Sequence, residues 1–392
     1  MSESRSETGK NLKELRKRRG FTQSELAAAS GVSLSIIRKL EQGERGTARL
    51  ETLRKLAASL RVETMRLSSG PNEDGPIVGT VERWEAVRHA LERPPLAPEL
   101  DDEAPTVGGV RSAFARAEPL FQKNQYAKLA VVLPPLLRDA EALGDEGRAV
   151  RVRLLQLAGL LMVQTRQFDT AEVALRRALD GAADRLEGAA TVNTQCWLLL
   201  RQGQLETALD LAVTWADETE PRMSRATSSE LSTWGLMLLK VTAAAVRNSQ
   251  PGQAADALRL ARAAAVALGR ESKSETDAIR AFGPTTVHLK RAENAGVVDC
   301  PDVVLDLAKR VPANAMPPSS NRNRYALGIA DALARTGQYA DGFEVLADIQ
   351  RAAPEWLPNQ TYARTVLRRI IEGRRTLTPE MRRMATGIQL EL

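Results

Sequence analysis

Apolar side chains recur with helical spacing along most of the chain, and polar side chains fill the positions between them. Near the amino terminus, Leu12 and Leu15 accompany a basic run and predict a first helix that ends at Gly20. Thr22 followed three positions later by Glu25 is a capping box, which predicts the start of a second helix. The pattern therefore predicts two short helices in close succession.

A third helix is predicted after a glycine turn. Gly31 permits the positive φ that a tight turn between helices needs, and Ser33 can cap the helix that follows. The inward positions of this helix are Ile36, Ile37 and Leu40, and the outward positions are Leu34, Ser35, Arg38 and Lys39. A helix with such a short, polar and basic face, held across another helix, fits the major groove of DNA.

Positive charge is concentrated at the same end of the chain. Residues 1–66 contain 15 Lys and Arg against 8 Asp and Glu, whereas the remaining residues contain 40 against 41. The formal net charge of +6 therefore comes from the amino-terminal unit. This asymmetry favours binding of phosphates by that unit and a different role for the rest of the chain.

Six positions of this unit carry a family resemblance at fixed spacing. They are Gln23, Ala27, Gly31, Val32, Ile37 and Leu40. With the segments 40–43 and 50–53 that follow, they resemble the helix-turn-helix domain of the Cro/C1 (XRE) type over about residues 9–67. The resemblance implies a five-helix DNA-binding domain within residues 1–67, called the HTH domain below. A small helical bundle with accidental positive charge is the alternative.

The resemblance also implies roles for individual residues. It places Gln23 at a phosphate, directs Leu34, Ser35 and Lys39 toward bases, and implies an ion pair between Arg16 and Glu41. Leu34 departs from the polar residue often found there, so contact with a thymine methyl group is expected instead of a hydrogen bond. The full predicted DNA-binding set is Gln23, Ser33, Leu34, Ser35, Arg38, Lys39, Arg45 and Arg49.

A linker separates the HTH domain from the rest of the chain. Residues 68–79 are rich in glycine, proline and acidic residues, which predicts a domain boundary. A helix over 81–91 follows before prolines and carboxylates break the pattern again, so the linker is predicted to span 68–109 and to contain one helix. Trp84 and His89 on this helix are interpreted as docking on the next domain rather than as a site.

From about residue 110 the chain repeats. Six anchor positions, each preceded twelve residues earlier by a small residue, are Leu129, Ala171, Ala208, Ala254, Val304 and Gly342, and the small residues are Ala117, Gly159, Cys196, Thr242, Ala292 and Ala330. The residues five positions before the anchors, mostly turn formers, are Asn124, Arg166, Gly203, Ser249, Asp299 and Gly337. Each unit is therefore predicted to be two antiparallel helices joined by a short turn.

These repeats resemble degenerate tetratricopeptide repeats, although their spacings exceed the ~34 residues of regular ones. The predicted fold class is all-α, with the HTH domain followed by a tetratricopeptide-like solenoid over 110–392 and no convincing strands. Such helix pairs stack into a superhelix with a concave inner surface, which is a binding architecture. Thr378 and Pro379 predict the start of a helix that caps the array.

Residues between about 190 and 330 are the candidates for a ligand site on that inner surface. They are Asn193, Trp197, Trp234, Phe282, His288 and Arg324. Core packing is the alternative for the aromatic members. Pro284 after Gly283 is predicted to kink the helix that carries it, and either the freed carbonyls line the hollow or the kink is a simple bend.

The order of the two domains resembles that of bacterial one-component regulators, some of which take peptide signals in the repeat domain. The resemblance implies a transcriptional regulator whose repeat domain senses a small molecule or peptide and forms a homodimer. Its two HTH domains are expected to bind two half-sites of a double-stranded DNA operator. A scaffold that grips a protein partner with the solenoid is the alternative.

Other function classes find little support in the sequence. No catalytic constellation or glycine-rich phosphate loop is recognised, so an enzyme and a cofactor are not expected. Two histidines cannot furnish a multi-histidine metal site, and Cys196 and Cys300 are predicted to be buried free thiols rather than a metal or redox pair. Because neither a signal peptide nor a membrane-spanning apolar run is recognised, a cytoplasmic protein without a membrane partner is expected.

Overall fold

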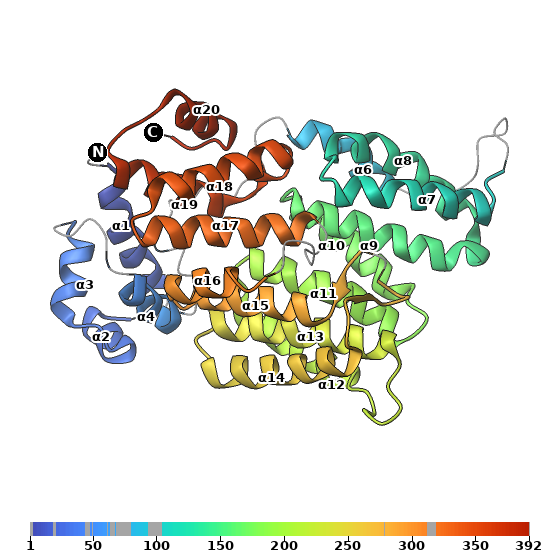
Figure 1. The fold of residues 1–392 in the computed structure, drawn as a ribbon, viewed down its shortest axis with the longest axis horizontal. Helices are drawn as coiled ribbons and strands as arrows, with labels where there is room; N and C mark the ends of the chain where they lie inside the picture. The colour runs from blue at the N-terminus through green and yellow to red at the C-terminus, as the bar shows by residue number, and fades with distance from the viewer. Residues whose placement is uncertain are drawn as a thin grey trace.

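The computed structural model describes residues 3–18, 21–43, 48, 50–60, 62, 67, 80–92, 104–277, 279–311 and 319–391. These residues form an almost entirely helical fold, in which an amino-terminal helix-turn-helix unit precedes a long array of helical hairpins (Figure 1). The predicted fold class is therefore confirmed.

Four described helices build the HTH domain, namely α1 (Glu3–Arg18), α2 (Gln23–Ser30), α3 (Leu34–Glu41) and α4 (Leu50–Leu60). Thr22 and Glu25 form the reciprocal capping box that starts α2, and Gly31 ends it with φ 66°. The core of the domain is apolar, with Leu26 and Ile37 fully buried. The fifth helix expected for this domain lies outside the described residues.

Helix α6 (Thr80–Glu92) packs against the helical array. Its Trp84 is buried in the same apolar cluster as the first hairpins, and Arg177 Nη1 donates to the carbonyl of Leu91 at 2.7 Å. Docking of this helix is thus as expected from Trp84, whereas His89 is exposed. Apart from 80–92 and 104–109, the predicted linker lies outside the described residues, and the domain boundaries remain predictions.

Six helical hairpins follow. Their helices are α7 (Val107–Gln122) with α8 (Tyr126–Ala142), α9 (Arg148–Gln164) with α10 (Phe168–Asp180), α11 (Arg185–Arg201) with α12 (Leu205–Glu218), α13 (Ser228–Arg247) with α14 (Pro251–Leu268), α15 (Pro284–Val297) with α16 (Pro301–Ala308), and α17 (Ser319–Arg335) with α18 (Tyr339–Ala352). A short 3₁₀ turn, η1 (Gly144–Gly147), connects the first two hairpins. The predicted pairing of helices is observed in every unit.

The predicted turn residues all adopt the left-handed conformation. Their φ values are 56° at Asn124, 65° at Arg166, 74° at Gly203, 59° at Ser249, 63° at Asp299 and 83° at Gly337. One left-handed residue ends each first helix and reverses the chain, which is the geometry of a tight helix C-terminus. The regularity of this turn explains why the repeat is visible in the sequence although its length varies.

The small residues of the pattern allow the two helices of a hairpin to approach closely. A Cβ added at Gly159 would lie 2.6 Å from Cδ2 of Leu175, which leaves no room for a side chain. In the fourth hairpin Thr242 occupies the same position, and its hydroxyl donates to the carbonyl of Ala254 at 2.9 Å. The two helices therefore approach closely at this position in both hairpins, through van der Waals contact at Gly159 and through a hydrogen bond at Thr242.

The first helices of successive hairpins contact one another in order, from α7 through α9, α11, α13 and α15 to α17. We call the surface that they form the inner face. After α18, a 3₁₀ turn η3 (Leu357–Asn359) and its flanks return to the early hairpins. Oε2 of Glu355 accepts a hydrogen bond from the amide of Ala127 at 2.7 Å, and Arg201 Nη2 donates to the carbonyl of Asn359 at 3.0 Å. These contacts tie the segment after α18 to the first and third hairpins.

Two further helices, α19 (Thr361–Arg374) and α20 (Pro379–Gly387), complete the described fold. Thr378 caps α20 by accepting a hydrogen bond from the amide of Met381, as the sequence predicts. Met381 and Met384 are buried against the preceding helices, so the last helix covers the apolar end of the array.

Three details of the sequence prediction are wrong. Two short antiparallel strands, β1 (Ser272–Lys273) and β2 (Ala281–Phe282), lie between the fourth and fifth hairpins where no strand is expected. Pro284 does not kink a helix but begins α15, because a proline at the first helical position removes no required hydrogen bond. Cys300 is exposed at the start of α16, whereas Cys196 is buried as predicted.

No helix of the described ranges combines the length and apolar character needed to cross a bilayer. Over the same residues, His, Cys, Asp and Glu side chains do not gather in groups of three or more that could hold a metal ion.

Candidate functional site

Helix α3 presents the predicted base-facing side chains on one exposed surface. Ser33 is the N-cap, and its hydroxyl accepts a hydrogen bond from the amide of Ile36 at 3.4 Å. Ser35, Arg38 and Lys39 are exposed, and Leu34 is half-buried. The helix lies at the outer edge of the molecule, away from the hairpins (Figure 1).

The opposite side of α3 is anchored in the core of the HTH domain. Ile37 and Leu40 are fully buried, which fixes the rotation of the helix about its axis. Helix α1 crosses α3 at Gly9, where a Cβ would overlap the carbonyl oxygen of Leu40. Sequence reasoning missed Gly9, although a glycine inside a helix costs about 1 kcal/mol and can mark such a close approach.

Arg16 and Glu41 form a bidentate ion pair between α1 and the end of α3. Arg16 Nε donates to Oε1 of Glu41 at 2.6 Å and Arg16 Nη2 donates to Oε2 at 2.8 Å. The side chains are 10% and 2% exposed, and Arg16 Nη1 also donates to the carbonyl of Phe21 at 2.8 Å. This fork-to-fork geometry fixes the angle at which α3 leaves the domain.

Gln23 joins the same cluster, because its Nε2 donates to Oε2 of Glu41 at 2.7 Å. Burial opposes ionisation of Glu41, but hydrogen bonds from Arg16 and Gln23 outweigh it and hold the pKa of that carboxyl below its ordinary value. The hydrogen bond to Glu41 likewise raises the pKa of Arg16 against the effect of burial. Both groups are therefore ionised at neutral pH.

The structure places most of the predicted DNA-binding residues on or beside α3, with Gln23 at the start of α2. Arg45 and Arg49 lie outside the described residues. The phosphate and base contacts of the whole set remain predictions, since they need DNA to be tested.

Comparison with known proteins identifies the family. The helix-turn-helix family profile matches residues 12–67. An uncharacterized HTH-type transcriptional regulator of Bacillus subtilis (strain 168), RghRB, is 33% identical over 124 residues, which are 31% of this chain and 79% of that protein. The chain belongs to the helix-turn-helix transcriptional regulators. It is thus a DNA-binding protein that regulates transcription. The relative that it resembles is a transcriptional regulator and does not belong to an enzyme family.

Two further proteins are similar to the regulator. The HTH-type transcriptional repressor RghR of the same B. subtilis strain is 41% identical over 54 residues, which are 14% of this chain and 40% of that repressor. The crystal structure of Bacillus thuringiensis PlcR in complex with the peptide PapR7 and DNA matches with a TM-score of 0.38 and 11% identity, covering 88% of this chain and 99% of that one.

Two of the predicted ligand residues of the regulator lie in its core. Trp234 is 4% exposed and Phe282 is fully buried in the apolar cluster of the third and fourth hairpins. The ring of Phe282 fills the space beside Gly235, where a Cβ would overlap it. These two residues therefore do not line a ligand site in this structure, and core packing, the alternative for aromatic residues, accounts for both.

Asn193 and His288 are engaged by backbone carbonyls. Asn193 Nδ2 donates to the carbonyl of Leu236 at 3.0 Å, and Nε2 of His288 lies 2.8 Å from the carbonyl of Leu307. Asn193 Oδ1 is buried without a hydrogen-bond partner in the described structure, but the space beside it is too small to hold a water molecule. Both side chains thus have a structural explanation.

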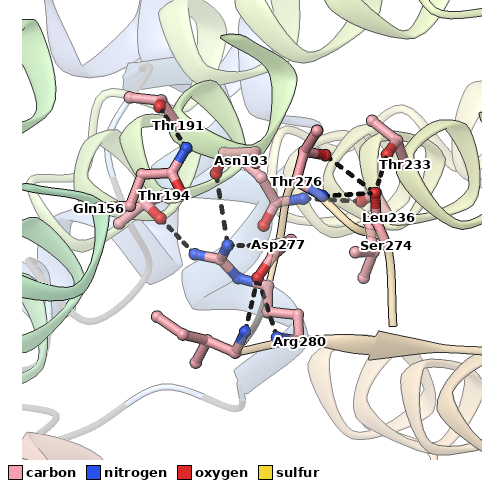
Figure 2. A network of polar contacts seen from close by, with 12 residues as sticks. Gln156, Thr191, Asn193, Thr194, Thr233, Leu236, Ser274, Thr276, Asp277 and Arg280 are labelled. Carbon is pink, nitrogen blue, oxygen red and sulfur yellow. Dashed lines mark hydrogen bonds and ion pairs between the residues drawn. The ribbon is translucent and has the colours of Figure 1, made fainter. Parts of the chain in front are cut away.

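Close to Asn193, a polar network holds the segment between α14 and α15 against α11 (Figure 2). Arg280 Nη1 donates to Oδ2 of Asp277 at 2.6 Å and to the carbonyl of Ala190 at 3.3 Å, and Arg280 also bonds the hydroxyl of Thr194. Oδ1 of Asp277 in turn accepts from the amides of Ile279 and Arg280. Because its partners are internal, this network is structural.

Trp197 and Arg324 are brought together on the inner face. The guanidinium of Arg324 lies 4.9 Å from the centre of the Trp197 ring, and that of Arg201 lies 5.4 Å from it. Such cation–π contacts orient the guanidinium groups without neutralising them. Trp197 is itself 9% exposed and belongs to an apolar core cluster, which leaves Arg324 as the predicted ligand residue that remains available to a ligand.

Sequence reasoning missed three charged residues on the same face, namely Lys240, Lys290 and Glu293. All three are half-buried on first helices. A signal for Lys240 is present in the sequence, because it is the single charged residue in the apolar run 231–246. A lysine in such a run is seldom buried unless it has a partner.

Proposed function

We propose that the regulator is a sequence-specific transcription factor whose repeat domain binds a small-molecule or peptide signal. In this proposal the signal controls the geometry of a homodimer in the cytoplasm, and thereby the affinity for an operator with two half-sites. The observation that carries the proposal is a contact between α4 of the HTH domain and α15 of the repeat domain.

Helix α15 reaches from the inner face to the HTH domain. Lys290 and Glu293 lie on the inner face, and Gly296, about one turn later, accepts a hydrogen bond from Nη2 of Arg54 on α4 at 3.4 Å. Because a short helix moves as a rigid body, a ligand that displaces Glu293 also displaces Gly296. Occupation of the inner face can therefore alter the position of the HTH domain.

The contact is weak enough to be shifted by a ligand. Arg54 is half-buried, and burial together with repulsion from Arg335 lowers its pKa to about 10. Ion pairs with Asp299 and Asp331 hold Arg335 in place, so its positive charge stays near Arg54. A long hydrogen bond set against a like charge contributes little net stability, which suits an interface that must change.

Dimerisation is proposed on physical grounds. Linking two DNA-binding domains makes the second binding event intramolecular, and the gain is largest when the linkage holds them at the half-site spacing. A ligand changes the affinity for DNA only if it prefers one dimer geometry over another. The repeat domain would thus supply both the linkage and the response.

The first experiment selects operators from random duplexes with the purified full-length chain. An operator with two half-sites is expected to bind at least about 100-fold more tightly than a duplex with one half-site. Equal affinities would contradict the homodimer. Binding without sequence preference would instead favour the protein-interaction scaffold, in which the HTH domain is not a specific reader.

A second experiment tests the coupling between the domains. Arg54→Gln is expected to change operator affinity by about threefold and to increase hydrogen exchange in α4, because its tie to α15 is lost. Arg310→Gln is the matched control, since Arg310 is an exposed arginine paired with Asp306 on α16. Identical behaviour of the two variants would contradict a role for the Arg54 contact.

A further inference from the structure

Charged side chains from three successive first helices meet on the inner face. Lys240 lies on α13, Lys290 and Glu293 lie on α15, and Arg324 lies on α17, while Arg247 approaches from the end of α13. These helices contact one another in order, and the charged groups lie close enough to perturb one another's pKa values. We call them the inner-face cluster.

The cluster contains four cations and one carboxylate. Glu293 is bound by Lys290 at 2.5 Å and by Arg247 Nη2 at 2.8 Å, so its two oxygens are engaged. In the described part of the chain, neither Lys240 nor Arg324 makes a hydrogen bond or an ion pair with a carboxylate. The cluster therefore has an excess of positive charge on a half-buried surface.

The surroundings of these groups disfavour their own charges. Burial, reinforced by repulsion from Lys290, Arg280 and Arg324, lowers the pKa of Lys240 well below its ordinary value. Burial also lowers the pKa of Lys290 and of Arg324, although Glu293 counteracts it in both cases. An anion beside these side chains would remove the repulsion and restore the ordinary charge state.

We propose that Lys240, Lys290 and Arg324 bind a ligand that carries at least two negative charges. Two ammonium groups act as mobile point charges, and the planar guanidinium of Arg324, oriented on the ring of Trp197, supplies a fork suited to a carboxylate or a phosphate. This inference rests on the proposed function, because it names the chemistry of the signal that the repeat domain binds.

The fold favours a small anion over a nucleic acid. Lys240, Lys290 and Arg324 are all half-buried. A small anion can reach half-buried cations more readily than the phosphates of a rigid duplex can. The dianionic group can belong to a compact metabolite or to an acidic peptide, and the experiment distinguishes these two sources.

Proton uptake is the signature of this site. Burial and neighbouring cations lower the pKa of Lys240 in the ligand-free chain and a bound anion raises it, so binding is accompanied by proton uptake at pH values between the two. Lys240 lies on α13, so its substitution leaves the cations of α3 untouched. Loss of the proton uptake in a Lys240 variant therefore separates binding on the inner face from phosphate binding on α3.

The test is calorimetric titration of the full-length chain at constant ionic strength, in two buffers of different ionisation enthalpy. The probes are inorganic pyrophosphate and the peptide tetraglutamate. We expect proton uptake with one of them, and we expect Lys240→Met and Arg324→Gln each to weaken that binding at least about tenfold. Lys128→Met, which removes an exposed lysine of α8, is expected to leave it unchanged.

Binding of pyrophosphate alone identifies a compact anion, and binding of tetraglutamate alone identifies an acidic peptide. The proposal is overturned if neither probe binds with proton uptake, or if the uptake persists in Lys240→Met. Lys240→Met relieves repulsion and is expected to fold, so it remains informative if Arg324→Gln does not. Operator titrations with the bound probe separate the two proposals, because an anion that binds without changing operator affinity sustains this site and contradicts the signalling function.

Discussion

Two groups of charged side chains in the regulator differ in how they are compensated. In the HTH domain, Arg16 meets Glu41 through two hydrogen bonds, and Gln23 and a backbone carbonyl satisfy remaining atoms. On the inner face, Glu293 binds Lys290 and Arg247, whereas within the described residues Lys240 and Arg324 have no carboxylate partner. The first group is complete within the chain, whereas the second lacks negative charge.

This difference indicates different roles for the two groups. A buried pair whose hydrogen bonds are all made holds two helices in a fixed orientation, which a DNA-binding surface requires. An excess of like charge on a half-buried surface costs stability unless a partner supplies the opposite charge. The comparison therefore assigns a structural role to Arg16 and Glu41 and a binding role to the inner-face cluster.

The largest expected effect comes from breaking the ion pair between Arg16 and Glu41. Arg16→Ala leaves the carboxylate of Glu41 buried without its partner, so we expect the HTH domain to lose about 3 kcal/mol of stability. Hydrogen exchange of the α1 and α3 amides in the full-length chain measures this loss locally. Arg38→Ala, which removes an exposed arginine of α3, is the control. Equal protection in the two variants would show that the pair is dispensable.

The next effect concerns the face of α3 that the ion pair orients. Lys39→Ala is expected to cost about 2 kcal/mol on the operator and little on a scrambled duplex, because a base contact is lost. Arg38→Ala is expected to weaken both duplexes alike and to reduce the salt dependence of binding by about one phosphate contact. Duplex titrations over a range of salt concentrations measure both. If Lys39→Ala lost the same affinity on both duplexes, the predicted contact of Lys39 with a base would be contradicted.

Much of the fold can be predicted from the sequence because local rules decide it. The turn position of the repeat contains Asn124, Ser249 and Asp299 as well as glycines, and all of them adopt positive φ. Short polar side chains and glycine tolerate that conformation best, so the spacing survives even where the repeat length varies. The capping box of Thr22 and the cap at Thr378 are equally local.

The inner face could not be predicted in the same way, because it depends on contacts between distant hairpins. Phe282 is fully buried because Gly235, on another hairpin, leaves room for its ring. Lys290 and Glu293 look like an ordinary solvated pair on a helix until α13 and α17 enclose them. An aromatic residue near polar ones is therefore a poor guide to a ligand site, and a single charge in an apolar helix is a better one.

A smaller effect is expected from removing one positive charge from the inner-face cluster. Lys240→Met is expected to stabilise the ligand-free chain by about 1 kcal/mol, since it removes a cation that has no carboxylate partner. The pKa of Lys240 is lower in the folded chain than in the unfolded chain, so the unfolded chain binds more protons between these two values. Stability of the natural chain therefore rises with pH in that interval.

The advantage of Lys240→Met should accordingly shrink as the pH rises toward the ordinary lysine pKa of about 10.4. Urea unfolding at several pH values measures the difference between the two chains. Lys128→Met provides the control for the loss of one exposed lysine. A destabilised Lys240→Met would mean that the charge is compensated, and the contrast between the two groups would disappear.

The smallest effect is expected when Arg16 and Glu41 are both replaced by apolar residues. Arg16→Met combined with Glu41→Leu removes both charges, so no buried charge is left unpaired, and we expect a loss below about 1 kcal/mol. Burial of Glu41 opposes the hydrogen bonds from Arg16 and Gln23, and the net result is a lowered pKa of that carboxyl. That lowering contributes stability above the unfolded-state pKa of about 4.3, and this contribution is lost as the pH falls through the folded-state value. The double variant should therefore lose less stability than the natural chain on acidification, which hydrogen exchange of α1 and α3 can measure. A double variant as unstable as Arg16→Ala would show that the pair contributes stability through its hydrogen bonds beyond orienting the two helices.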